Sequence, residues 1–167
     1  MKISTVPEGY TSFTPWIVSA NTAAQIKFLE GAFHAVEIPG SRITNDDGII
    51  IHAVVKIGTA IVMLFDSRKG WGPTPALLNL YVEDVESTFK QAIALGATPV
   101  TKITQLWFGE KVCRVLDPLG NLWWICERVE DMDFSKAATP EAIEGIGYIQ
   151  QSLNDALLKQ KELFGGR

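Results

Sequence analysis

The feature that most constrains the fold of this chain is a repeat in the order of its predicted elements. Each half reads as a strand, then a helix, then further strands, and the second half follows the first by about 62 to 64 residues. Few residues are identical between the halves, so only the order of elements repeats. The repeat predicts two similar units that each bury one face of a sheet and share a cavity.

The first half contains one predicted helix between strand-forming segments. Residues 12–18, 49–57 and 60–65 are rich in β-branched and aromatic side chains and predict strands. Asn21 is a favourable N-cap, and the apolar residues that follow it recur at helical spacing: Ala23, Ile26, Phe28, Leu29 and Phe33. Residues 67–75 contain two glycines and two prolines and predict a loop that separates the halves.

The second half repeats this order. Strands are predicted over 77–82, 100–103, 111–116 and 122–126. A helix between the first two of these strands is marked by its apolar residues and ends at a C-terminal glycine: Val85, Phe89, Ile93, Leu95 and Gly96.

Residues 134–167 predict a helical extension. Thr139 is a good N-cap and Pro140 suits the first helical position, whereas Gly145 and Gly147 weaken the first turns. The apolar stripe of this helix is Ile143, Ile146, Ile149, Leu153, Leu157 and Phe164. An isolated helix must bury such a stripe, so we expect it to pack back on the domain or to cross to a second subunit.

Composition excludes several classes of protein. Apolar residues make up 47% of the 167 residues, which is typical of a globular chain, and the net charge of −4 disfavours nucleic-acid binding. No apolar stretch reaches the roughly 18 residues of a membrane span, and the start of the chain lacks the apolar run of a signal peptide. Two cysteines make no disulfide framework, so we expect a cytoplasmic protein.

Five short motifs resemble the vicinal oxygen chelate superfamily of glyoxalases, bleomycin-resistance proteins and extradiol dioxygenases, and most of all its PhnB-like branch. They are Thr14 to Val18, His52 to Gly58, Leu80 to Val85, Leu95 to Thr98 and Asp117 to Trp123. The resemblance implies an α+β fold over residues 9–131: two tandem βαβββ modules, about 9–66 and 76–131, form a curved mixed sheet around a shared cavity, followed by a C-terminal helix. It also implies a homodimer.

Enzymes of this superfamily hold a divalent metal with His, Gln or Glu side chains from the first and last strands of each module. By motif, these positions fall on Thr14, Met63 (or Val62), Leu77 and Trp124, none of which is a usual metal ligand. The chain has only two histidines, and His34 is expected at the end of a helix. We therefore predict no metal site and no cofactor.

Strand alternation predicts which side chains line the cavity instead. In residues 49–57, Ile51 belongs to the face expected to pack on a helix, and His52 to the opposite face. The predicted ligand-binding residues are Trp16, His52, Asn79, Arg114 and Trp124. Of these, His52 and Arg114 lie 62 positions apart and are expected at equivalent places in the two modules.

Each of these residues also has a structural interpretation. The two tryptophans either stack on a ligand or fill the core, and His52 is either a ligand contact or a core histidine bonded to a backbone carbonyl. Arg114 either binds an anion or pairs with a carboxylate such as Glu110. Buried packing is the expected role of Cys113 and Cys126. The segment 107–109 is either a lid over the pocket or part of a dimer contact.

Two functional classes follow. The first is a metal-independent protein that binds and sequesters a small molecule, as the resemblance to the bleomycin-resistance branch implies. The second is an enzyme of this superfamily, a lactoylglutathione-lyase-like lyase or isomerase or a dioxygenase-like enzyme, with His52 as the candidate catalytic acid/base or with a rearranged metal site. In both classes the expected partners are a small molecule and a second copy of the chain.

Overall fold

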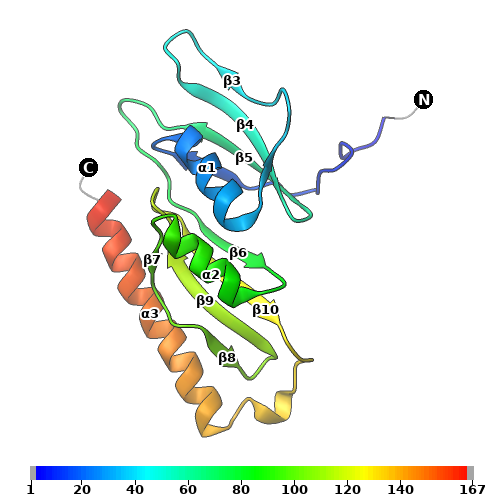
Figure 1. Ribbon diagram of the computed structural model, residues 1–167, viewed down its shortest axis with the longest axis vertical. Helices are drawn as coiled ribbons and strands as arrows, with labels where there is room; N and C mark the ends of the chain where they lie inside the picture. The colour runs from blue at the N-terminus through cyan, green and yellow to red at the C-terminus, as the bar shows by residue number, and fades with distance from the viewer. Residues whose placement is uncertain (1–2, 165–167) are drawn as a thin grey trace. The chain divides into compact units, whose positions relative to one another are not determined.

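The computed structural model describes residues 3–164, with side chains described for residues 3–161. The chain divides into two compact units, Met1–Pro75 and Ala76–Arg167. Figure 1 shows a mixed sheet with one helix beside it in the first unit, and a second sheet with a short helix and a long C-terminal helix in the other.

The first unit is a five-stranded sheet with one helix. Its elements are β1 (Trp16–Ser19), α1 (Thr22–Phe33), β2 (Val36–Glu37), β3 (Ile43–Thr44), β4 (Ile50–Ile57) and β5 (Ala60–Asp66). The strand order is β1-β5-β4-β2, with β3 also paired to β4. Only β1 and β5 are parallel; the other pairs are antiparallel.

The second unit repeats this arrangement and adds a C-terminal helix. Its elements are β6 (Leu77–Tyr81), α2 (Val85–Ala94), β7 (Thr98–Pro99), β8 (Thr104–Leu106), β9 (Glu110–Leu116), β10 (Leu122–Arg128), a 3-10 turn η1 (Phe134–Lys136) and α3 (Pro140–Phe164). The order is β6-β10-β9-β7, with β8 on β9 and β6 parallel to β10. The predicted class, α+β with tandem modules and a C-terminal helix, is confirmed.

In both units, a carboxylate at or near the end of the last strand binds the start of the helix. Asp66 accepts hydrogen bonds from the backbone N–H groups of Thr22 (2.6 Å) and Ile50 (2.8 Å). In the second unit, Glu127 accepts from the N–H of Val85 (3.1 Å). A negative charge at this position satisfies an otherwise unpaired helical N–H and interacts favourably with the helix dipole.

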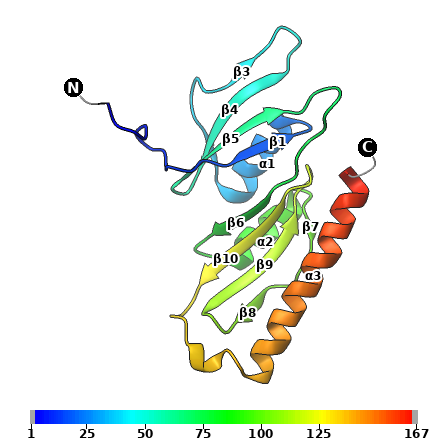
Figure 2. The ribbon, with the colours of Figure 1, turned by 180° about the vertical axis from the view of Figure 1, so that it is seen from behind.

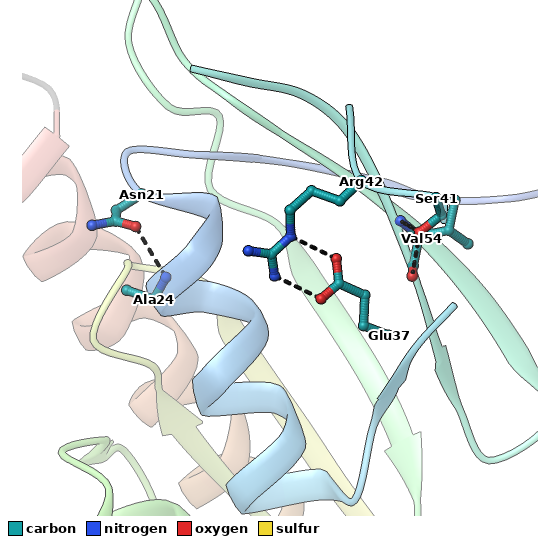
Figure 3. Close-up of polar contacts among 6 residues, drawn as sticks. All are labelled: Asn21, Ala24, Glu37, Ser41, Arg42 and Val54. Carbon is teal, nitrogen blue, oxygen red and sulfur yellow. Dashed lines mark hydrogen bonds and ion pairs between the residues drawn. The ribbon is translucent and has the colours of Figure 1, made fainter. Parts of the chain in front are cut away.

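Each of these helices also begins at a side-chain cap. Asn21 Oδ1 accepts from the N–H of Ala24 at 3.0 Å (Figure 3), and Asp84 Oδ1 accepts from the N–H of Ser87 at 2.9 Å. The cap at Asn21 is the predicted one, whereas the cap at Asp84 was not predicted from the sequence.

The segment between β2 and β3 is attached to β4 by side-chain contacts (Figure 3). Ser41 Oγ donates to the carbonyl of Val54 (3.3 Å) and accepts from its N–H (3.0 Å). Arg42 and Glu37 form a bidentate ion pair at 2.8 and 2.6 Å, and the hydrogen bond to Glu37 raises the pKa of Arg42. These contacts hold this segment along the open edge of the sheet.

The predicted alternation of β4 is wrong at one position. Ile51 was expected to pack on a helix but is 37% exposed, whereas its neighbour Ile50 is buried. The register of β3 against β4 shifts between Ile43 and Thr44, opposite this part of the strand. Such a bulge bends the strand and interrupts regular alternation.

The predicted strand over 100–103 is also wrong. The chain pairs with β9 just before it, in β7, and just after it, in β8. Within the gap, the N–H groups of Val100 and Thr101 both bond to the carbonyl of Arg114, at 2.9 and 3.3 Å. Because two residues of this segment lie opposite one residue of β9, the regular backbone hydrogen bonding between the strands is interrupted. Residues 100–103 therefore connect the short strands β7 and β8 and do not form a strand themselves.

The long helix α3 runs alongside β8 (Figure 2), and it buries only part of the predicted stripe: Ile146 and Leu153 are half-buried, and the side chain of Phe164 lies outside the described residues. Ile149 is buried as expected, but Ile143 is 65% and Leu157 41% exposed. Within residues 140–161, the buried side chains of α3 are Ala142, Ile149, Ser152 and Ala156. Because most of these are small, the helix lies close to the sheet. Among the described residues, no helix is long and apolar enough to cross a membrane.

The two glycines of α3 provide a matched test of this packing. A Cβ at Gly147 would meet nothing within 4 Å, whereas one at Gly145 would lie 3.2 Å from Leu106 Cδ2. We expect Gly147→Ala to raise the free energy of unfolding by about 0.5–1 kcal/mol through helix propensity. Gly145→Ala should gain clearly less, because Leu106 must move. Urea unfolding measures both, and an equal gain for the two variants would contradict the close contact.

Candidate functional site

An aromatic cluster lies on the first unit's sheet. Trp16 makes edge contacts with His52 (ring centroids 5.7 Å apart) and with Phe65 (5.4 Å), and Phe65 contacts Trp71 at 6.0 Å. Trp16 is 46% and Trp71 45% exposed. Core filling therefore does not describe Trp16, whose ring presents an apolar surface to solvent.

The imidazole of His52 is oriented by the backbone. Its Nδ1 lies 3.0 Å from the carbonyl oxygen of Ser41. A carbonyl only accepts, so Nδ1 carries the proton in this hydrogen bond and Nε2 is the accepting nitrogen. The bond to a backbone carbonyl is thus observed, together with the contact with Trp16, and His52 is only half-buried.

The other three predicted residues meet in the second unit. Trp124 of β10 pairs with Asn79 of β6 on one side and with Arg114 of β9 on the other, so the three form one row across the sheet. The Arg114 guanidinium carbon lies 4.0 Å from the centroid of the Trp124 ring. Next to this row, Cys126 Sγ donates to Asn79 Oδ1 at 3.4 Å.

Arg114 is the most buried of the five residues, at 2% exposed. Its Nη1 donates to the carbonyl of Ile149 in α3, and burial lowers its pKa. The alternative of a pair with Glu110 is wrong, because Glu110 instead accepts from Tyr81 Oη at 2.8 Å. That hydrogen bond raises the pKa of Tyr81.

The predicted equivalence of His52 and Arg114 is wrong by one row. In the first unit, the row that matches Asn79, Trp124 and Arg114 consists of Trp16, Met63 and Val54. Whether Trp124 is matched to Met63 or to Val62, the β4 residue opposite it is Val54 or Val55, and not His52. The turn between β4 and β5 is two residues, 58–59, but the one between β9 and β10 is five, 117–121, so a constant offset of 62 does not hold along the chain.

The residues at the superfamily's metal positions do not fit a metal. Thr14 and Met63 border a hollow of about 500 Å³ that is otherwise lined by residues from 5–12. Leu77 is 57% exposed, and Trp124 lies against Arg114. A hydroxyl, a thioether, a hydrocarbon and an indole are a poor donor set for a divalent cation.

Three residues near these groups were not among the predicted site residues. Tyr81 follows Asn79 on the same face of β6, so alternation alone could have included it. Phe65 shares the face of Met63 on β5 by the same rule. Trp71 lies in the Gly- and Pro-rich loop, and no periodicity in the sequence places it beside Phe65.

Both cysteines are buried, as predicted. Desolvation raises the pKa of each thiol, Cys113 and Cys126, to about 12. A raised pKa disfavours the thiolate form, which agrees with a packing role for both cysteines.

Comparison with the sequences of known proteins shows which proteins are related to this chain. No protein-family model matches the sequence. Two mycobacterial proteins are 30% identical over 147 residues, which is 81% of this chain: uncharacterized protein Mb0911c of Mycobacterium bovis, of which 95% is covered, and uncharacterized protein Rv0887c of Mycobacterium tuberculosis, of which 85% is covered. The chain belongs to the same family as these proteins.

Solved structures identify the fold as that of the vicinal oxygen chelate superfamily. TioX from Micromonospora sp. ML1 matches with a TM-score of 0.59 and 22% identity, over 71% of this chain and 99% of that one. A glyoxalase/bleomycin resistance protein/dioxygenase family enzyme from Burkholderia phytofirmans matches at 0.57 and 20%, over 70% and 97%. A PhnB protein from Bacillus cereus matches at 0.55 and 20%, over 70% and 99%.

Proposed function

We propose that this member of the family binds a flat, partly apolar small molecule without a metal ion and thereby sequesters it. The observation that carries the proposal is the half-exposed aromatic cluster of Trp16, His52, Phe65 and Trp71. Large aromatic rings are usually packed away from water, and exposed ones that touch each other are typical of sites for flat ligands.

The sheet geometry supports this role for the cluster. Strand alternation puts Ile17 and Leu64 on the opposite face of β1 and β5, where both are completely buried near α1. Trp16 and Phe65 lie on the other face of the same two strands. We expect a bound ring to stack on Trp16 and to take up a hydrogen bond from or to His52.

The row in the second unit is proposed, separately, as a polar binding surface of that unit. Asn79 offers an amide, and Arg114 a cation held against the Trp124 ring. Such groups fix the orientation of a ligand more than they add to its affinity.

A second candidate function is a lyase or isomerase that uses His52 as acid/base. The hydrogen bond from Nδ1 to the Ser41 carbonyl favours it, because it fixes the tautomer in which Nε2 can accept a proton. A substrate would have to be turned over, whereas a sequestered ligand is recovered unchanged after release.

A stacking site makes a specific prediction for Trp16. We expect 2-naphthol, a flat neutral probe, to bind, and Trp16→Ala to weaken its binding about tenfold through loss of aromatic contact. Isothermal titration calorimetry measures the affinity. Trp107→Ala is the matched control, because Trp107 is partly exposed but belongs to the other unit. Unchanged binding in Trp16→Ala, or equal loss in the control, would contradict the site.

Metal content is a separate test. We expect elemental analysis of the purified protein to find less than about 0.1 equivalent of Zn, Ni, Fe or Mn per chain, because the positions at Thr14, Met63, Leu77 and Trp124 offer no adequate donors. Chelator treatment should leave the melting temperature unchanged. About one metal per chain, lost to chelator together with stability, would contradict metal-independent binding.

We also propose that the protein is a homodimer, as the resemblance implies, and that it is cytoplasmic. The two buried, unpaired thiols support a reducing compartment.

A further inference from the structure

The second unit contains a buried cation without a counter-charge. A guanidinium stays ionised in proteins, and an ion taken out of water needs a partner of opposite charge. Arg114 is 2% exposed, yet none of the Asp or Glu side chains described over residues 3–161 forms an ion pair with it. Its ring contact with Trp124 and the carbonyl of Ile149 offset only part of the charge.

Two neighbouring donors here also have no acceptor. Among the described residues, both Arg114 Nε and Trp124 Nε1 are buried and without a hydrogen-bond partner. Buried donors of this kind are rare in folded proteins and indicate a group that is missing from the site. Because the two side chains are stacked at 4.0 Å, one oxygen-bearing group could satisfy both.

The helix that covers Arg114 is held by polar contacts as well as by apolar packing. Besides the bond from Arg114 to Ile149, the Tyr148 hydroxyl accepts from the N–H of Lys102 (2.8 Å), and Gln160 Nε2 donates to the carbonyl of Gly120 (2.7 Å). Over residues 140–161, Ile149 is the only large apolar side chain of α3 that is fully buried. Ile149 and Ala156 are buried against the sheet, and Tyr148 and Leu153 are partly buried there, so α3 separates only if ligand binding offsets the loss of these contacts.

We propose that Arg114 and Trp124 form, within the second unit, the binding site for the carboxylate group of a small molecule, and that α3 is a lid whose Ile149 carbonyl occupies that site until the carboxylate displaces it. The planar fork of Nε and an Nη group matches the two oxygens of a carboxylate, and Trp124 Nε1 donates alongside. An anion there supplies the missing charge and both missing acceptors. The inference rests on the proposed function for the binding of small molecules, and it names the charged group that the second unit recognises.

Benzoate and benzamide, which share a shape but differ in charge, test the site by calorimetry at constant ionic strength. We expect the protein to bind benzoate at least tenfold more tightly than benzamide. Arg114→Met should abolish that preference, whereas Arg42→Met, which removes an exposed arginine paired with Glu37, should keep it. Equal affinity for the two probes, or a preference that survives Arg114→Met, would overturn the proposal.

Trp124→Phe gives a second test that does not depend on how well Arg114→Met folds. It keeps a ring beneath Arg114 and removes one unpaired N–H, so the melting temperature should stay the same or rise. We expect benzoate binding to weaken severalfold and benzamide binding to stay unchanged. Loss of stability without a selective loss of benzoate binding would show a packing role only.

Hydrogen exchange tests the lid. Saturating benzoate should speed amide exchange over residues 145–156 of α3 and slow it in β9 and β10, and benzamide should do neither. Unchanged or slower exchange in α3 with benzoate bound would overturn the lid. If 2-naphthol binds through Trp16 but benzoate shows no preference, the carboxylate site alone fails; if neither probe binds, the proposed function fails as well.

Discussion

Replacing Asp117 with alanine is expected to lower the free energy of unfolding by about 3 kcal/mol or more. Asp117 is 3% exposed and holds the loop between β9 and β10. Its carboxylate accepts from the N–H groups of Leu119 and Asn121 (both 2.9 Å), from Asn121 Nδ2 (3.0 Å) and from Trp123 Nε1 (3.0 Å). Alanine leaves these donors without their acceptor, and hydrogen bonds to a charged group contribute about 1.5–3 kcal/mol each, although not additively.

Urea unfolding of Asp117→Ala measures this loss. The matched control is Asp46→Ala, an exposed aspartate in the turn before β4, which should change stability by less than about 0.5 kcal/mol. Asp117→Asn should fall between the two, because one amide oxygen can still accept while the NH₂ group faces other donors. A loss below about 1 kcal/mol for Asp117→Ala would show that the loop does not depend on this carboxylate.

Gly109→Ala is expected to cost about 3 kcal/mol or more, because the glycine has neither room nor a conformation for a side chain. A Cβ there would lie 2.3 Å from the carbonyl oxygen of Glu130 and 2.9 Å from its carbon, both backbone atoms. The φ angle is +85°, in the left-handed region. The Gly109 carbonyl also accepts from the N–H groups of Val129 and Glu130 (2.9 and 3.1 Å), so the clash cannot relax without breaking this contact.

Gly58→Ala separates the cost of the steric clash from the cost of the left-handed backbone conformation. Gly58 also has a positive φ, +56°, but a Cβ there would meet nothing within 4 Å. Its cost should be the conformational part alone, about 1 kcal/mol. Thermal or urea unfolding compares the variants, and similar losses for both would mean that Glu130 moves aside easily.

The order of elements and the fold class could be read from the sequence. The helical spacing after Asn21 and the alternation along the strands are local patterns. The apolar residues of each element show which of its faces is buried. The Asp-Pro-Leu-Gly-Asn-Leu-Trp motif at 117–123 is likewise local, because Asp117 binds partners no more than six residues away. The same local rules placed Trp16 and His52 on one sheet face, and Asn79, Arg114 and Trp124 on another.

Contacts between distant segments were decided only by the tertiary structure. Arg114 pairs with the carbonyl of Ile149, 35 residues away, and not with nearby Glu110, because α3 docks on the sheet through Ile149 together with small residues, Ala142, Ser152 and Ala156, that lie outside the predicted stripe. Two loops of different length shifted the register, so that Val54 or Val55, and not His52, matches Arg114. Local periodicity determines which face a side chain takes, but strand register and helix docking depend on the summed packing of the whole unit.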